Sequence, residues 1–144
     1  MRIAIASDHG GLSFRAAILS HLESSGHAVT DMGTHDTSSC DYPDYAHALS
    51  EVVLAGQADR GVLICGTGQG MAIAANKHPG IRAAVVTDVF SARMATLHND
   101  ANVLCLGERV LGLGLALELV DAWISATFEG GRHARRVGKI DLSD

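Results

Sequence analysis

Five short runs of apolar and β-branched residues recur along the chain, and stretches with helical spacing separate them. The runs show little alternation with polar residues, which is typical of strands buried on both faces of a sheet. They predict strands at Arg2–Ser7, His27–Asp31, Gly61–Cys65, Arg82–Thr87 and Asn102–Leu106. The stretches between them predict helices at Gly11–Ser25, Ala46–Ala55, Gly70–Lys77, Ser91–His98 and Leu111–Thr127.

Strands that alternate with helices predict βαβ units with right-handed crossovers, and therefore a parallel sheet. We expect one domain over residues 1–144, an α/β fold built as a three-layer α/β/α Rossmann-like sandwich with a five-stranded parallel sheet and a C-terminal helical extension. Ligands of such folds bind beyond the carboxyl ends of the strands. Polar groups that should converge there are Asp8-His9, Cys65-Gly66-Thr67-Gly68, Thr87-Asp88 and Gly107-Glu108-Arg109, with Asp41-Tyr42-Pro43 in the loop before the second helix.

Charge and hydropathy argue against two kinds of partner, nucleic acids and membranes. A formal net charge of −5 argues against nucleic acid as the main partner, because neutralising phosphates needs a broad basic face. No apolar run reaches the roughly 18–20 residues that cross a bilayer, and the N-terminal residues form a strand pattern and not a signal peptide. We expect a cytoplasmic protein with no membrane partner. The three cysteines, Cys40, Cys65 and Cys105, form no Cys-x-x-Cys pair, so we expect free thiols and no metal site.

The turn Cys65-Gly66-Thr67-Gly68-Gln69-Gly70 joins a predicted strand to a predicted helix. It is not a Walker A loop, and the turn after the first strand, Asp8-His9-Gly10-Gly11, lacks the Gly-x-Gly-x-x-Gly dinucleotide fingerprint, which argues against NAD. Its backbone amides could stabilise a thiolate or hold an oxyanion that develops on a substrate. A lone cysteine at the end of an apolar strand is also commonly a small buried hydrophobe. The residues alone leave the two interpretations of Cys65 evenly balanced.

Two further groups carry candidate chemistry. His98-Asn99-Asp100-Ala101-Asn102 gathers four polar side chains before a buried strand, and His98 could act as a general acid or base, or simply cap its helix. If the basic segment Glu129–Lys139 is helical, Arg132 and Arg136 lie on one face and suit a phosphate dianion. Such a segment is otherwise an ordinary solvated tail. Asp8 is interpreted equally well as a helix N-cap.

Seven motifs occur in one order: Ser7-Asp8-His9-x-Gly11, Asp41-Tyr42-Pro43, Cys65-Gly66-Thr67-Gly68-x-Gly70, Ala74-Ala75-Asn76-Lys77, Gly80-Ile81-Arg82-Ala83, His98-Asn99-Asp100-x-Asn102 and Glu129-Gly130-Gly131-Arg132-His133. Together they resemble the sugar-phosphate isomerase family that includes type B ribose-5-phosphate isomerases and galactose-6-phosphate isomerase subunits. The resemblance covers about residues 2–137. Met71 together with Cys65 is similar to the branch that uses a cysteine base, since another branch has a glutamate at position 71.

The resemblance implies an aldose–ketose isomerase that interconverts ribose 5-phosphate and ribulose 5-phosphate through an enediolate, without metal or cofactor. It implies that Cys65 is the base, that His98 opens the sugar ring and that Thr67 assists at the oxyanion. The implied substrate contacts are Asp8, His9, Tyr42, Gly66, Thr67, Gly68, Gln69, Gly70 and Asn99, with Arg109, Arg132 and Arg136 on the phosphate.

The resemblance also implies a homodimer with shared active sites, or a tetramer built from such dimers. The C-terminal segment, about 128–144, should then contact the partner subunit. Two alternatives stay open: a hexose 6-phosphate isomerase of the allose or galactose type, and a phosphosugar-binding protein without catalytic activity.

Overall fold

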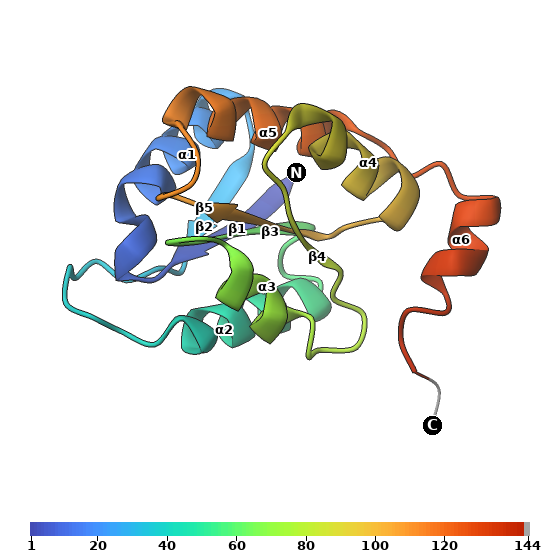
Figure 1. The fold of residues 1–144 in the computed structure, drawn as a ribbon, viewed down its shortest axis with the longest axis horizontal. Coiled ribbons are helices and arrows are strands. Elements are labelled where there is room, and N and C mark those ends of the chain that lie inside the picture. The colour runs from blue at the N-terminus through green and yellow to red at the C-terminus, as the bar shows by residue number, and fades with distance from the viewer. Residues whose placement is uncertain (143–144) are drawn as a thin grey trace.

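The computed structural model describes residues 1–142, and its centre is a five-stranded parallel sheet with helices on both faces (Figure 1). The strand order is β2-β1-β3-β5-β4, with β1 at Arg2–Ser7, β2 at Ala28–Asp31, β3 at Arg60–Cys65, β4 at Ala83–Val85 and β5 at Val103–Gly107. The helices are the 3-10 turn η1 (His9–Gly11), α1 (Leu12–Ser24), α2 (Tyr42–Leu54), α3 (Gln69–Ala75), α4 (Val89–Asn99), α5 (Leu113–Ser125) and α6 (Arg132–Val137). The predicted three-layer fold is confirmed.

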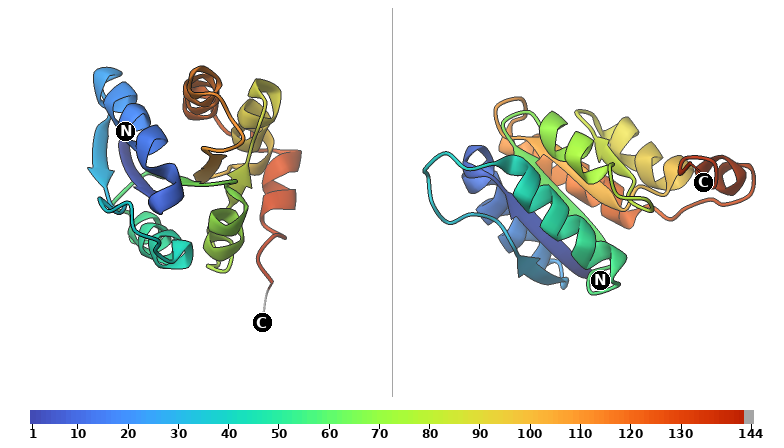
Figure 2. Two further views of the ribbon diagram at one scale, coloured as in Figure 1. Left: turned by 60° about the vertical axis from the view of Figure 1, so that its left-hand side comes forward. Right: turned by 90° about the horizontal axis from the view of Figure 1, so that it is seen from below.

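The two outer layers bury opposite faces of the sheet (Figure 2). Alternate residues of a strand point to opposite sides, so Val62 and Ile64 of β3 join the core formed with α1, α4 and α5. Leu63 and Cys65 of the same strand face α2 and α3 and join the second core. The thiol of Cys65 therefore belongs to the layer that contains α2 and α3.

The edge strands depart from the prediction of burial on both faces. That pattern holds for β1, β3 and β5, whereas β2 is largely exposed and β4 is only half-buried, because each has a neighbouring strand on one side alone. The side-chain amide of Asn76 closes the outer side of β4, since its Nδ2 donates to Ala83 O at 2.9 Å and its Oδ1 accepts from Ala83 N at 2.8 Å. Asn76 therefore replaces the missing strand at this edge.

Helix α2 begins at Tyr42, four residues before the predicted start at Ala46, so Tyr42 and Pro43 lie in its first turn and not in a loop. A proline is compatible with the first turn of a helix because the amides there have no intrahelical acceptor. The expectation of a loop at this position was wrong. It rested on the apolar spacing, which starts only at Ala46.

The order of the strands places a topological switch point between β1 and β3. After β1 the chain crosses to β2 on one side, and it then crosses to β3 on the other side of β1. Helices α1 and α3, which follow β1 and β3, pack on opposite faces of the sheet. Open α/β sheets bind ligands in the crevice at such a point, beyond the carboxyl ends of the strands.

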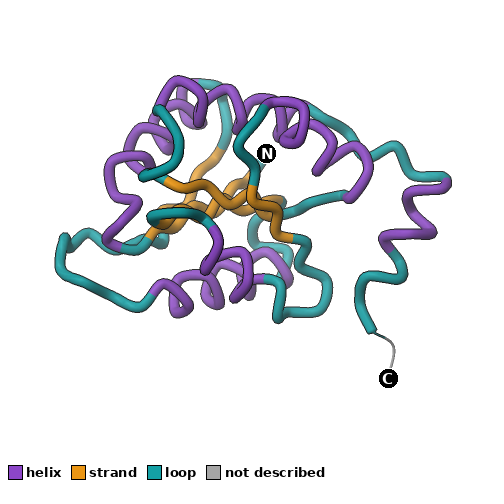
Figure 3. Tube along the Cα trace, viewed as in Figure 1, coloured by secondary structure: helices purple, strands orange, loops and turns teal. Residues whose placement is uncertain are grey.

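The C-terminal part forms the predicted helical extension, α6, which packs against α4 and lies outside the sandwich (Figures 1 and 3). Arg132 and Arg136 are one helical turn apart in α6, as the basic segment predicted. Within residues 1–142, every helix is too short or too polar to cross a bilayer.

Candidate active site

The glycine turn after β3 directs a backbone amide at the thiol of Cys65. Gly68 adopts a left-handed φ of 79°, and its N–H donates to Cys65 Sγ at 3.1 Å. The next amide, of Gln69, donates to Thr67 Oγ1 at 3.3 Å. Cys65 is buried, with 6% of its surface exposed. A donated N–H stabilises negative charge on the sulfur, so this geometry suits a thiolate as well as a packed thiol.

The turn after β1 packs directly against the glycine turn. Asp8 is buried, and its Oδ1 accepts from Gly10 N at 2.8 Å, so it caps η1 as the simpler interpretation predicted. A Cβ placed on Gly10 would lie 3.3 Å from the backbone nitrogen of Gly66. A side chain at residue 10 would therefore require the glycine turn to move by a few tenths of an ångström.

His9, which follows Asp8, is held by the loop that precedes α2. The backbone N–H of Cys40 donates to His9 Nδ1 at 3.3 Å, and Cys40 Sγ lies 3.8 Å from the same nitrogen. Because an amide can only donate, Nδ1 is the unprotonated nitrogen, and the proton of the neutral ring is on Nε2. His9 can therefore donate one hydrogen bond to a ligand oxygen.

The same loop rests on Arg15, a buried arginine of α1. Its Nη1 donates to Ser7 Oγ at 3.0 Å, and its Nε lies 3.2 Å from Asp31 Oδ1. A Cβ on Gly33 would overlap the guanidinium, so the loop backbone lies directly on it. Our prediction missed Arg15 and the contact of Cys40, although an arginine on the buried face of a helix was a usable signal.

Tyr42 and Arg109 border the glycine turn from two sides. A Cβ on Gly70 would lie 2.7 Å from Cε2 of the Tyr42 ring, and one on Gly66 would lie 3.3 Å from Arg109 Cδ. The predicted residues that the chain brings together here form what we call the thiol cluster. Its members are Asp8, His9, Tyr42, Cys65, Gly66–Gly70 and Arg109.

A second group, the histidine cluster, lies where α4 meets α6. Its members are His98, Asn99, Glu129, Arg132, His133 and Arg136. The rings of His98 and His133 are stacked, with centroids 4.2 Å apart and planes 3° from parallel. Glu129 Oε2 lies 3.8 Å from His98 Nε2 and 3.5 Å from His133 Nε2, and the Glu129 N–H donates to Leu97 O at 3.0 Å.

His98, Glu129 and His133 are residue types that bind metal ions, and one ligand atom from each lies within 4.8 Å of the others. The arrangement does not fit an ion. Lone pairs of imidazole nitrogens lie in the ring planes, so two parallel stacked rings direct them side by side and not toward one centre. A tetrahedral site would require at least one ring to rotate out of the stack.

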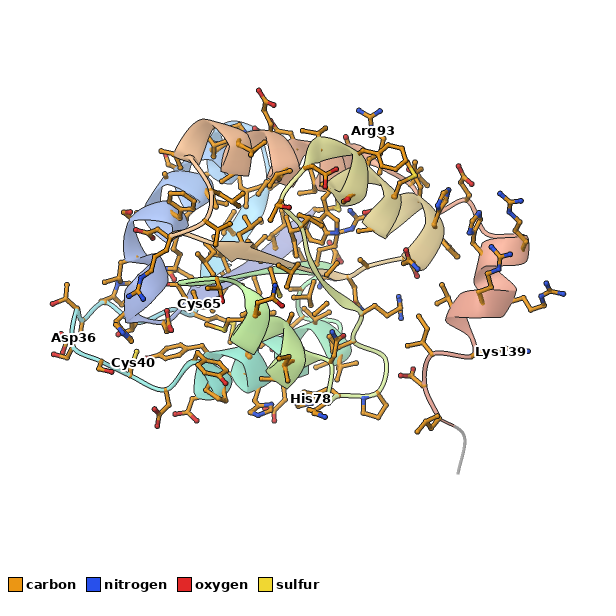
Figure 4. The ribbon with its side chains drawn as sticks, viewed as in Figure 1. Asp36, Cys40, Cys65, His78, Arg93 and Lys139 are labelled. Carbon is orange, nitrogen blue, oxygen red and sulfur yellow. The ribbon has the colours of Figure 1, made fainter. Side chains whose placement is uncertain are left out.

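The two clusters lie at opposite ends of the strands, the thiol cluster at the carboxyl end of β5 and the histidine cluster near its amino end. Cys65 is opposite Gly107, the last residue of β5, whereas α4 ends at Asn99, four residues before β5 begins. A five-residue strand spans about 13 Å at the usual rise per residue, so the clusters are at least that far apart along β5. In Figure 4, Cys65 lies left of the centre of the molecule, whereas Lys139, just beyond α6, lies at its right-hand side.

A cavity of about 370 Å³ lies beside the edge strand β4, away from Cys65. It is bounded by Arg82, Asn99 and the C-terminal segment at Ile140 and Asp141. It therefore adjoins the histidine cluster through Asn99 alone.

Several predicted polar groups serve the fold instead. Asp88 Oδ1 accepts from Ser91 N at 2.8 Å and caps α4. The carboxylate of Glu108 accepts from the Ser13 hydroxyl and the Phe14 amide at the start of α1. Asp100 forms an ion pair with Arg82 at 2.8 Å, and Asn102 Oδ1 accepts from Arg82 N at 2.8 Å. These residues do not join either cluster.

The three thiols differ in their surroundings, and all are free. Burial raises the pKa of Cys105 far above the usual range for a thiol, and the nearby Cys65 adds a smaller increase. Cys105 is therefore a neutral core residue. Cys40 contacts His9.

Comparison with known proteins identifies relatives over nearly the whole chain. The family model described as Ribose/Galactose Isomerase matches residues 3–140. The chain is 48% identical to Ribose-5-phosphate isomerase B of Escherichia coli (strain K12), over 96% of this chain and 93% of the relative. It is 43% identical to D-erythrulose-4-phosphate isomerase of Pectobacterium atrosepticum, over 97% of this chain and 93% of the relative.

Solved structures agree with these sequences. The chain superposes on Clostridium thermocellum Ribose-5-Phosphate Isomerase B with a TM-score of 0.96 and 57% identity, covering 97% of this chain and 95% of the other. A similarity at this level extends to the placement of the strands and turns that carry both clusters.

The contact between Cys40 and His9 predicts the tautomer of His9. Cys40→Ala keeps the backbone N–H, so His9 should still carry its proton on Nε2. Cys40→Pro removes that donor and should release the ring into a mixture of the two tautomers. Long-range ¹⁵N–¹H NMR spectra of the histidine rings distinguish these states. A protonated Nδ1 in the unsubstituted protein would contradict the assignment.

Proposed function

The chain belongs to the Ribose/Galactose Isomerase family, and we propose on that premise that it interconverts D-ribose 5-phosphate and D-ribulose 5-phosphate. The observation that carries the proposal is the amide of Gly68 aimed at Cys65 Sγ, in the crevice where the turns after β1 and β3 meet. The names of the relatives at 48% and 57% identity support the choice of a pentose phosphate.

In the proposed reaction, the thiolate of Cys65 removes the proton from carbon 2 of the open-chain aldose. The electron pair of that C–H bond forms the double bond of an enediolate, and the carbonyl oxygen on carbon 1 takes the negative charge. The hydroxyl on carbon 2 then passes its proton to the oxygen on carbon 1, and the carbon 2 oxygen becomes the new carbonyl. Carbon 1 takes the proton from the Cys65 thiol, which regenerates the thiolate. No electrons leave the sugar, so the step needs no external oxidant or reductant.

Stabilising the enediolate is the main demand on such a site, because a C–H bond beside a carbonyl is only weakly acidic. We assign this role to the amides of the Gly66–Gly70 turn with help from Thr67. Two hydrogen bonds already fix the turn: the Gly68 N–H donates to Cys65 Sγ, and the Gln69 N–H donates to Thr67 Oγ1. Groups that are fixed before the reaction lose little energy to reorganisation when charge develops.

The thiol cluster offers the remaining contacts to the sugar. Asp8, His9 and Tyr42 border the crevice, and the Nε2–H of His9 is the available donor of its ring. Arg109 extends across the glycine turn near Gly10 and supplies the only arginine of this cluster. We place Arg109 and His9 at the phosphate end of the substrate.

The histidine cluster supplies what the thiol cluster lacks. His98 is proposed to open the furanose ring by proton transfer, Asn99 to contact the sugar, and Arg132 and Arg136 to bind the phosphate. Since the two clusters of one chain are separated by the length of β5, a complete site requires a second copy of the chain. We therefore propose a homodimer in which each site combines one thiol cluster with the partner's histidine cluster, delivered through the C-terminal segment from about residue 128.

Three alternatives differ from this proposal, two in the substrate and one in the absence of catalysis. A relative at 43% identity is named D-erythrulose-4-phosphate isomerase, so a tetrose phosphate is the second candidate. A hexose 6-phosphate needs room for one more carbon, and a galactose type needs a second, different subunit. A phosphosugar-binding protein without catalysis would leave Cys65 and His98 without a joint purpose.

Two substitutions separate the proposed chemical steps. Ribulose 5-phosphate cannot form a furanose, because its carbon 5 oxygen is esterified, so exchange of its carbon 1 proton with solvent needs the base but no ring opening. Cys65→Ser should slow both isomerisation of ribose 5-phosphate and this exchange by roughly a thousandfold. His98→Asn should slow isomerisation by about a hundredfold and leave the exchange rate nearly unchanged.

Deuterium incorporation followed by NMR measures the exchange, and a coupled assay measures isomerisation. Cys105→Ala, which alters the other buried thiol on the same face of the sheet, is the matched control and should keep both rates. Full activity of Cys65→Ser would remove Cys65 from the mechanism.

The shared site predicts recovery of activity from two inactive variants. When Cys65→Ala and His98→Asn chains exchange subunits, each mixed dimer contains one site with both native clusters. Random exchange should therefore restore about a quarter of the wild-type rate. Each variant carried alone through the same unfolding and refolding is the control. Absence of recovery, with mixed dimers verified by native mass spectrometry, would contradict a site built from two chains.

A panel of sugar phosphates tests the substrate. We expect kcat/KM for ribose 5-phosphate to exceed that for erythrose 4-phosphate, allose 6-phosphate and galactose 6-phosphate by at least about tenfold, since one carbon changes the fit of both ends of the substrate. A higher value with another sugar would reassign the substrate within the family. Saturable binding without any proton exchange would favour the binding protein.

A further inference from the structure

His133 is a buried histidine that none of the proposed steps uses. It lies in α6 with 6% of its surface exposed, whereas the arginines of the same helix are exposed. One face of its ring stacks on His98, and its Nε2 lies 3.4 Å from Arg132 Nε. A single imidazole therefore touches both the proposed ring-opening residue and a proposed phosphate ligand.

We propose that His133 is a positioning residue that aligns His98 through the ring stack and holds the Arg132 guanidinium through its Nε2. The inference rests on the proposed function for the roles of His98 and Arg132. It adds a requirement that the function alone does not contain: one side chain fixes the positions of both His98, the acid–base group, and Arg132, the phosphate ligand.

The contact with Arg132 determines the state of the ring. Nε2 of His133 lies 3.4 Å from Arg132 Nε, which can only donate, and 3.5 Å from Glu129 Oε2, which can only accept. Under the proposal, Nε2 accepts from Arg132 in the shorter of the two contacts, and the single proton of the neutral ring is on Nδ1. Burial lowers the pKa of His133, and His98, Arg132 and Arg136 lower it further, while Glu129 raises it. The ring is therefore neutral at neutral pH.

A neutral ring at this position favours the proposed chemistry of His98. The groups that face His133 are His98 from α4, Glu129 from the preceding loop, and Arg132 and Arg136 from α6. If His133 carried a positive charge, it would oppose protonation of the stacked His98 and would repel both arginines. It would also lose the lone pair that accepts from Arg132.

The stack restricts His98, which would otherwise have considerable freedom. The His98 side chain is 38% exposed and lies near the end of α4, and its ion-pair partner, Glu129, is half-exposed and 3.8 Å away. A parallel ring with its centroid 4.2 Å away blocks rotation about the last side-chain torsion. Without it, the imidazole of His98 would sample orientations that miss the substrate.

Two substitutions separate the two contacts. His133→Phe keeps a planar ring against His98 and removes the acceptor for Arg132. It should weaken inhibition by inorganic phosphate and raise KM by about tenfold, with kcat changed less. His133→Gln keeps an acceptor near the position of Nε2 and removes the stacked ring. It should lower kcat for ribose 5-phosphate by about fivefold, with phosphate inhibition and the proton exchange of ribulose 5-phosphate nearly unchanged.

Arg135→Ala, in the same helix, is the matched control and should change neither property. Thermal unfolding of each variant shows whether α6 stays folded. Equal losses of kcat and phosphate affinity in both His133 variants, in step with a lower unfolding temperature, would make His133 a packing residue and overturn the proposal.

A spectroscopic measurement tests the proposal without turnover. The ¹⁵N spectrum of the unsubstituted protein should show His133 protonated at Nδ1 and bare at Nε2, and binding of inorganic phosphate should be weaker in His133→Phe than in His133→Gln. A proton on Nε2 would overturn the contact with Arg132. If the unsubstituted protein isomerises no sugar phosphate, the proposed function fails, and these two readouts still decide the role of His133.

Discussion

The close approach of the glycine turn to the end of β5 is the constraint on which the thiol cluster depends. A Cβ on Gly107 would lie 2.7 Å from the carbonyl carbon of Thr67, and one on Gly68 would lie 3.1 Å from that of Leu106. In this turn Gly68 has a positive φ, and its N–H donates to Cys65 Sγ. A side chain at either glycine would push the turn outward, separate the amide from the sulfur and open the contact with the turn after β1.

The sequence predicts the centre of this fold well and its edges less well, for a physical reason. Burial on both faces demands apolar side chains at successive positions, so β1, β3 and β5 are visible as continuous runs. An edge strand does not need apolar side chains at successive positions. Strand β4 has three residues, and the side chain of Asn76 hydrogen-bonds to the backbone on its outer side. The start of α2 was missed because its first turn presents polar residues and a proline before the apolar spacing begins.

The same difference applies to the candidate site. Local motifs identify side chains but not the partners that they meet, and His98-Asn99-Asp100-x-Asn102 illustrates this. Asp100 and Asn102 bind Arg82 and order the approach to β5, whereas His98, at the end of α4, stacks on His133. The contact of Cys40 with His9 joins residues 31 positions apart. No pattern within either segment predicts it.

The charge distribution explains why α6 needs the contacts that it has. The whole chain is acidic, with a net charge of −5, so an anionic substrate requires positive charge gathered in one place. Helix α6 supplies it, although it lies outside the sandwich, where it packs on α4 (Figure 1). Of the α6 side chains, His133 alone is buried, and Glu129 ties the preceding loop to Leu97 of α4. The helix with the densest positive charge is therefore held by few contacts, and these contacts include the stack on His98. The contacts that hold the proposed phosphate ligands in place therefore also hold the proposed acid–base histidine, His98.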